Sequence, residues 1–224
     1  MKFARALDFR PANDWLRVMS TVNPTLPTGY SPVPPGHVAN VATFLEMTSR
    51  SAGQPQVVAS DLSIRRWLYP DLAAYRRLFR AVGENWLWQS RLVMPDDRLL
   101  EIFRNPDVEI YRLFRDETVA GLLELDFDTP PECELSFFGV VPGEIGKGSG
   151  RFLMAQAIAC AWARPISRLW VHTCTFDHPA ALQFYKRSGF TPYQMKVEVH
   201  ADPRLTGHLP LSAAPHVPIV KRQE

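Results

Sequence analysis

Residues 140–150 read Val-Val-Pro-Gly-Glu-Ile-Gly-Lys-Gly-Ser-Gly, and this stretch leads from a β-type segment into a predicted helix. Glycines at the alternate positions 146, 148 and 150 leave the backbone N–H groups of the turn uncovered. The start of a helix adds further unpaired N–H groups and the positive end of the helix dipole. The stretch is therefore typical of a site that binds phosphate groups.

Two common nucleotide-binding patterns do not fit this stretch. A Walker P-loop would need a glycine at Val141 and a hydroxyl residue at Gly148, and a dinucleotide fingerprint would need a glycine at Arg151. What remains is a short loop whose N–H groups surround a compact anion. Lys147 and Arg151 share one face of the first helical turn, where their charges oppose the helix dipole unless an anion is bound.

Composition excludes several classes of protein. The formal charge of the 224-residue chain is +2, and its basic residues are scattered, so we expect no nucleic-acid partner. The sequence has neither an apolar run of transmembrane length nor a secretory core at its start, so we expect a cytoplasmic protein without a membrane partner. Cys133, Cys160 and Cys174 are interpreted as reduced thiols. His172 and Cys174 share a strand face, but two ligands do not make a metal site, so no metal is expected.

Regular signals begin near Gln56 and predict the order β, α, α, β, β, β, α, β, α, β. The expected strands are 57–64, 108–114, 119–127, 134–141, 168–175 and 191–199, and the expected helices are 71–82, 96–103, 147–164 and 179–188. Asp116 and Glu117 indicate a hairpin, so the three consecutive strands should form an antiparallel meander. The later crossovers need parallel or mixed pairing. The order predicts an α/β fold with a central mixed, mostly antiparallel sheet and helices on both faces.

The two ends of the chain carry weaker signals. Prolines from Pro24 to Pro35 oppose regular structure, and residues 38–48 fit a strand or a short helix. We therefore divide the chain into an N-terminal extension (1–55), a domain (56–199) and a C-terminal tail (200–224).

The glycine stretch does not stand alone. Its pattern, Val-x-Pro followed by Gly-x-Gly-x-Gly at the start of a helix, resembles the acetyl-CoA motif of the GNAT superfamily of acetyltransferases. Farther along the chain, the Ala-x-x-Phe-Tyr-x-x-x-Gly-Phe signature of that superfamily is matched by Ala181, Phe184, Tyr185, Gly189 and Phe190. The interval between the two motifs fits one helix and one strand. The resemblance covers about residues 56–199 and implies acetyl-CoA as co-substrate.

The resemblance also implies a set of residues that bind acetyl-CoA. The backbone N–H groups from Ile145 to Gly150 would bind the pyrophosphate, and the strand end would pair with the pantetheine arm, with an N–H near Val140 holding the thioester carbonyl. The family often has Arg or Gln where Ile145 stands, to support the loop. The expected set is Val140, Val141, Ile145, Gly146, Lys147, Gly148, Ser149, Gly150, Arg151 and His178.

Two catalytic residues are expected by the same resemblance. Tyr185 is the candidate acid for the departing thiolate, although its ring also fits a packing role. Glu134 is the candidate base, and strand alternation places it on one face with Ser136 and Phe138. The alternatives for the base are Glu132, Glu124 and His172.

The acceptor side is less defined. His178 stands where the family often has an Asn near the acetyl donor, and Asp177 is interpreted as a helix cap. Aromatic residues in the first helices fit either an acceptor pocket or the core. These are Tyr75, Trp86 and Trp88.

We therefore expect an N-acetyltransferase that moves an acetyl group to a primary amine by direct attack in a ternary complex. The acceptor is a small molecule or a peptide, and neither a monomer nor a homodimer is excluded. One alternative is a non-catalytic acyl-CoA sensor. The other is a scaffold with a vestigial core whose Pro-rich ends bind partners.

Overall fold

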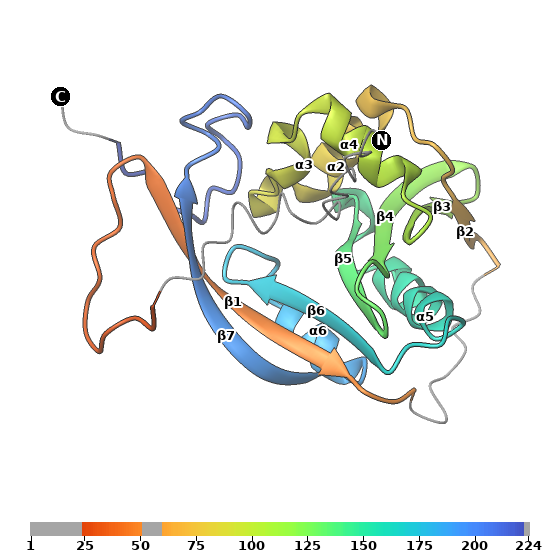
Figure 1. Cartoon of the computed structure of the whole chain (residues 1–224). Helices are drawn as coiled ribbons and strands as arrows, with labels where there is room; N and C mark the ends of the chain where they lie inside the picture. The colour runs from red at the N-terminus through yellow and green to blue at the C-terminus, as the bar shows by residue number, and fades with distance from the viewer. Residues whose placement is uncertain (1–23, 51–59, 222–224) are drawn as a thin grey trace, which may run out of the picture.

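A computed structural model describes residues 24–50 and 60–221. Within them, seven strands form one mixed sheet with helices on both faces, as Figure 1 shows, which confirms the expected fold class. The strands are β1 (His37–Met47), β2 (Leu62–Arg66), β3 (Val108–Arg115), β4 (Thr118–Asp126), β5 (Glu132–Val140), β6 (Arg168–Cys174) and β7 (Thr191–Ala201). The helices are α2 (Leu72–Gly83), α3 (Ser90–Val93), α4 (Asp96–Arg104), α5 (Ser149–Ala161) and α6 (Ala181–Arg187), with 3-10 turns η1 (Glu84–Trp86) and η2 (Pro142–Glu144). No helix in the described ranges has the length and apolar character needed to cross a membrane.

Local signals account for the first half of the sheet. Strands β2 to β5 pair in chain order as an antiparallel meander. Asp71 caps α2 by accepting the Ala74 N–H at 2.8 Å, and Asp116 takes a left-handed φ of 50° in the β3–β4 turn. The strand expected from Val57 is observed as β2, and its first expected residues lie outside the described part of the chain.

Strand β1 lies inside the sheet, between β6 and β7. It is antiparallel to both neighbours, with Leu45 opposite Val171 of β6 and Val41 opposite Val197 of β7. The sheet therefore extends into the segment that the sequence assigned to an N-terminal extension. The partners of β1 are more than 120 residues away along the chain, so no local pattern specifies this pairing.

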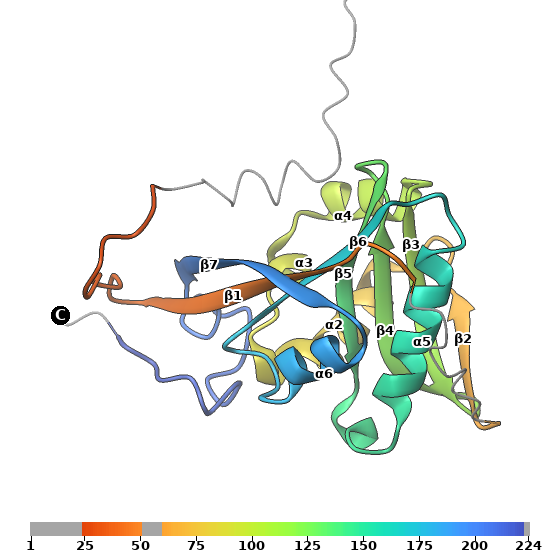
Figure 2. The ribbon, with the colours of Figure 1, turned by 90° about the horizontal axis from the view of Figure 1, so that it is seen from below.

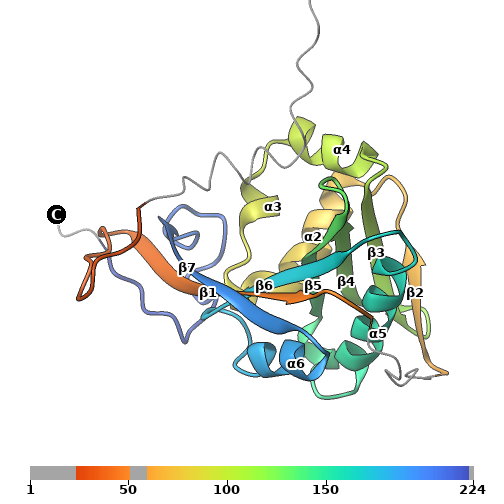
Figure 3. The same cartoon turned by 60° about the horizontal axis from the view of Figure 1, so that its bottom comes forward.

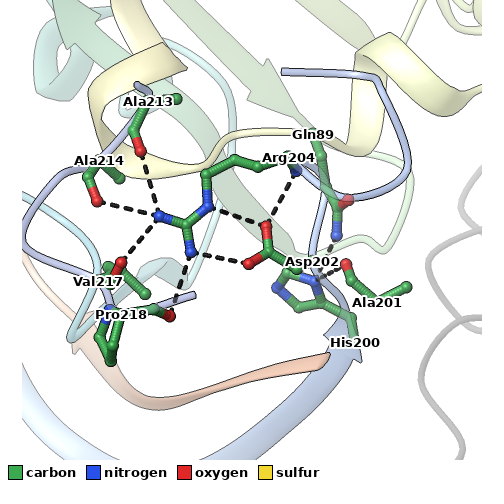
Figure 4. A network of polar contacts seen from close by, with 9 residues as sticks. All are labelled: Gln89, His200, Ala201, Asp202, Arg204, Ala213, Ala214, Val217 and Pro218. Carbon is green, nitrogen blue, oxygen red and sulfur yellow. Dashed lines mark hydrogen bonds and ion pairs between the residues drawn. The ribbon is translucent and has the colours of Figure 1, made fainter. Parts of the chain in front are cut away.

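Residues 202–221, expected as a tail, contain turns but neither helix nor strand, and they pack against the rest of the fold. Arg204 organises them, as Figure 4 shows. Its side chain is 1% exposed, and it pairs with Asp202 at 2.8 Å. It also donates to four backbone carbonyls, those of Ala213, Ala214, Val217 and Pro218. The segment encloses a small apolar cluster with Val38 of β1, so it belongs to the folded unit.

The two faces of the sheet carry separate cores, and Figure 3 shows helices on either side of the sheet. Helices α5 and α6 cover one face, where Leu153 and Tyr185 pack against Leu123 of β4. Helices α2 and α4 cover the other face, where Phe79 and Leu99 pack with Leu122. Consecutive residues of β4 therefore enter opposite cores, as expected for a strand that is buried on both faces.

Candidate active site

The glycine loop leads from the end of β5 through η2 into α5. Gly146 and Gly148 have φ angles of 81° and 85°, in the left-handed region that favours glycine. Gly148 is the N-cap, so the helix begins at Ser149 and not at Lys147 as expected. Within the described residues, no partner accepts the N–H groups of Gly146, Gly148, Ser149 or Gly150. The loop therefore presents free donors at the positive end of a helix dipole.

Nothing in the described part of the chain requires a glycine at position 150. Its φ is not in the left-handed region, and a Cβ built there would meet no described heavy atom within 4 Å. Glycine is nevertheless about 0.5–1 kcal/mol less favourable than alanine inside a helix. A missing side chain at this place is typical of a backbone that a bound group approaches closely.

A charged network supports the loop from the sheet side. Glu144 accepts hydrogen bonds from the Ser149 hydroxyl and, at 2.9 Å, from Arg115 Nε. Arg115 also donates to Ser149 Oγ at 2.9 Å and pairs with Asp61. The hydrogen bonds from Arg115 and Ser149 lower the pKa of Glu144, so it is ionised at neutral pH. Ile145 is 44% exposed. The polar contacts that support the loop come instead from Arg115, which is 29 residues from Glu144 and which the sequence did not indicate.

The two basic residues expected at the loop are both exposed. Lys147 Nζ lies 3.9 Å from Glu144 Oε1, and the Arg151 side chain lies on the solvent side of the first turn of α5. Neither side chain is held in place by burial, so each can reach toward an anion bound at the loop.

Strands β5 and β6 separate partway along their length, as Figure 1 shows. They pair in parallel only from Glu132 with Arg168 to Glu134 with Trp170. Beyond that point β5 continues beside β4 as far as Val140, and β6 continues beside β1. Each strand therefore has an edge that faces the split, and the glycine loop follows the far end of the β5 edge.

The N–H group of Val140 points into this split. Val141 donates its own N–H to the Ala120 carbonyl of β4 at 2.9 Å. Successive N–H groups of a strand point to opposite edges, so that of Val140 faces away from β4. This is the donor that the family resemblance assigns to the thioester carbonyl.

A β-bulge at Ser136 changes the faces of β5. Leu135 lies opposite Leu125, but Phe137 lies opposite Glu124, which leaves Ser136 as the extra residue. The expected alternation, with Phe138 on the same face as Glu134, is therefore wrong. Phe138 packs with α6, and Phe137 packs on the α2 side.

Glu134 lies where the split begins, on the α2 side of the sheet. Its side chain is 14% exposed, and His172 Nδ1 is 4.0 Å from its Oε1. Burial and the nearby charge of Asp126 raise the pKa of Glu134 to about 8. A carboxylate with this pKa is well matched to general base catalysis near neutral pH.

The alternative carboxylates are engaged in the fold. Glu124 is fully buried, accepts the Tyr75 hydroxyl at 2.7 Å and pairs with Arg91. Glu132 pairs with Arg168 at 3.1 Å at the surface side of the sheet. Both already have cationic partners, which leaves Glu134 as the better base of the three.

Tyr185 lies on α6, on the face opposite Glu134. Its ring packs near those of Phe138, Phe184 and Phe190, with centroids about 6 Å away. Burial raises the pKa of the hydroxyl, which therefore stays protonated at neutral pH. Among the described residues the hydroxyl has no hydrogen-bond partner, and it is not sealed from solvent. Glu134 and Tyr185 therefore lie on opposite faces of the sheet.

Asp177 differs from its expected role as a helix cap. Asp177 does not cap α6 but accepts hydrogen bonds from the Thr173 hydroxyl and the Cys174 N–H. The His178 ring instead accepts the Ala180 N–H at 3.1 Å. Its ring also lies 5.4 Å from that of Trp86, in an edge-to-face contact.

Trp88, for which the sequence left a pocket role and a core role open, packs against the core on the α2 side. Its Nε1 donates to Asp177 Oδ1 at 3.4 Å, and its ring covers Gly139 of β5. A Cβ at Gly139 would lie 2.3 Å from Val82 Cγ1, so glycine is required there for close packing. Trp88 therefore links β5 to the loop after β6. Tyr75, in contrast, is completely buried and belongs to the core.

The thiols near the site are poorly suited to be nucleophiles. Burial raises the pKa of Cys174 to about 12 and raises that of the buried Cys133 as well. Burial raises the pKa of Cys160 as well. A thiol attacks as its thiolate, so these groups are largely inert at neutral pH.

Known proteins with similar folds include two of low sequence identity. A functionally unknown conserved protein from Staphylococcus epidermidis matches 75% of this chain at 15% identity with a TM-score of 0.53. A GCN5-related N-acetyltransferase from Kribbella flavida matches 77% of it at 14% identity with a TM-score of 0.52. This chain spans 63% of the length of each. A comparison with curated proteins finds no match.

A family model assigns the chain more directly. The model of the Acetyltransferase (GNAT) family matches residues 69–190, which include the glycine loop, the split and α6. More than half of the chain is covered, and the two structures above share its fold. The chain therefore belongs to the Acetyltransferase (GNAT) family, whose members are acetyl-CoA-dependent acyltransferases.

Proposed function

We propose that the protein transfers an acetyl group from acetyl-CoA to a primary amine by direct attack in a ternary complex. The observation that carries this proposal is the continuous path from the free N–H groups of the glycine loop along the open edge of β5 to Glu134. In this proposal the phosphate site and the base would lie at the two ends of one strand edge.

Acetyl-CoA would lie along this path. The N–H groups of Gly146, Gly148 and Gly150 would bind the pyrophosphate, and Lys147 and Arg151 would approach its charge from solvent. The pantetheine arm would pair with the β5 edge as an added strand does. The N–H of Val140, which faces the split, would donate to the thioester oxygen.

The chemistry needs one proton acceptor and one proton donor. The amine nitrogen attacks the thioester carbonyl carbon, and its proton passes to Glu134 directly or through a water. The Val140 N–H stabilises the negative charge that develops on the oxygen. The carbon–sulfur bond then breaks, and the CoA thiolate takes the proton of the Tyr185 hydroxyl. The raised pKa values of Cys133 and Cys174 support direct transfer, because thiols that stay protonated are poor nucleophiles for forming an acetyl-cysteine intermediate.

The acceptor would enter from the α2 side, where Glu134 lies. Asp126 and Glu134 are both on that side, and each carries or can carry negative charge. This favours an acceptor that arrives as an ammonium cation and loses its proton at the site. Trp88 contacts Asp177 and Trp86 contacts His178, both in the loop after β6. These two rings would contact the apolar part of such an amine.

The test is CoA release measured with a thiol reagent over a panel of small amines and peptide N-termini. The proposal predicts release that depends on the amine, with an acetylated product seen by mass spectrometry. Initial rates should follow a sequential pattern in both substrates. Tight acetyl-CoA binding without turnover on any amine would favour a sensor, and failure to bind acetyl-CoA would point to a scaffold.

A further inference from the structure

Strand β7 forms one edge of the sheet, as Figure 2 shows. Among the described residues it pairs only with β1, so its outer row of N–H and C=O groups is unpaired. The strand is 11 residues long, from Thr191 to Ala201. Long open edges of this kind are uncommon in isolated proteins because they pair readily with another strand.

One face of this edge is also apolar. Met195 is 67% exposed, Val197 is 46% exposed and Val199 is 47% exposed. These three residues alternate along the strand and so share one face. Val199 lies opposite Ala39 of β1, whereas the neighbouring residue Val38 is buried beneath the C-terminal segment. The C-terminal segment therefore covers the other face at Val38 of β1, and the face that carries Met195, Val197 and Val199 is bare.

The strand is complementary to a copy of itself. An antiparallel pair of β7 strands with its two-fold axis at Val197 places Lys196 opposite Glu198 of the second copy, and does so twice. The same register places Met195 opposite Val199 and Val197 opposite itself. The paired stretch reaches from Gln194 to His200, so Pro192, which has no N–H, stays outside it.

We propose that two copies of this protein associate through β7, which joins their sheets into one continuous sheet. Backbone hydrogen bonds along the edge provide the contact, and the two Lys196–Glu198 pairs set the register. A second copy is favoured over another partner because one strand supplies both halves of the charge pattern. This association is independent of the chemistry at the glycine loop.

Glu198 has a buried partner, Asn40, whereas Lys196 has only a ring contact among the described residues. Lys196 Nζ lies 4.5 Å from the centre of the Phe44 ring, and Glu198 accepts a hydrogen bond from Asn40 at 2.9 Å. Both residues are exposed. A change of the Lys196 charge should therefore alter the association without unfolding the chain. Glu198→Lys also removes the acceptor of the buried Asn40 amide, so its stability is measured together with its association.

The test is a charge swap followed by light scattering coupled to size exclusion and by sedimentation equilibrium. The wild type should be a dimer. Lys196→Glu places like charges opposite each other twice, and Glu198→Lys does the same, so each should weaken the dimer about tenfold or more. The double variant Lys196→Glu/Glu198→Lys restores both pairs and should recover the dimer.

A control variant separates this from a general charge effect. Arg104→Glu makes the same change of charge on α4, which covers the sheet far from β7, and should leave the dimer unchanged. Circular dichroism confirms that each variant is folded. A monomeric wild type would overturn the proposal. A dimer that resists both single changes, or that the double variant fails to recover, would overturn it as well.

Discussion

The substitution Gly150→Ala should change stability and ligand affinity in opposite directions. Gly150 lies in the first turn of α5, and an added Cβ meets no described heavy atom within 4 Å. Alanine is favoured over glycine in a helix by about 0.5–1 kcal/mol. For a chain of this size that gain corresponds to a rise in Tm of about 1–4 °C.

The same methyl group should weaken binding of CoA. If the pyrophosphate sits against the N–H groups of this turn, the methyl group displaces a phosphate oxygen from its donor. Loss of a hydrogen bond to a charged group costs about 1.5–3 kcal/mol, which is a loss of affinity of about tenfold or more. Calorimetric titration with CoA measures the affinity, and thermal unfolding of the free protein measures the stability.

Gly143→Ala provides a matched control. Gly143 lies in η2, has equally open space around it and is outside the expected pyrophosphate contacts. The control should leave the affinity unchanged. A Gly150→Ala protein that is more stable and binds CoA as tightly as the wild type would refute the assignment of the loop.

Three further predictions concern the other parts of the site and the fold. Glu134 must be ionised to accept a proton, and its pKa is raised to about 8, so kcat/KM should rise as the pH passes through about 8. Glu134→Gln should abolish this rise of kcat/KM with pH. A rise that persists in the variant would mean that another group is the base. Tyr185→Phe should lower kcat with little effect on acetyl-CoA affinity, and unchanged turnover would mean that the thiolate leaves without this acid. Arg204→Ala leaves Asp202 buried without its cation and should lower the free energy of unfolding by about 3–5 kcal/mol in urea. An effect under about 1 kcal/mol would show that residues 202–221 contribute little to the fold.

Features that depend on neighbouring residues were predicted correctly from the sequence. The helix after Pro70, the hairpin at Asp116 and the end of the helix before Gly189 all follow from local backbone preferences. The glycine loop was found for the same reason, because free N–H groups follow from glycines at the start of a helix.

Features that depend on residues far apart in the chain were not predicted from the sequence. Residues 38–48 fit a strand or a short helix from the sequence alone, and pairing with segments far along the chain determines that they form strand β1. The bulge at Ser136 inverts the face of Phe138, and its cause lies in the pairing with β4. The contact between Arg115 and Glu144 and that between Trp88 and Asp177 join residues whose spacing carries no pattern.

The most direct test of the central claim is the release of CoA from acetyl-CoA in the presence of a primary amine. The account predicts thiol release that saturates with the amine concentration and yields one acetylated product for each CoA. At low acetyl-CoA concentration, Gly150→Ala weakens CoA binding and should abolish this release. The contradicting result is an intact protein that binds acetyl-CoA but shows no amine-dependent thiol release on any acceptor tested.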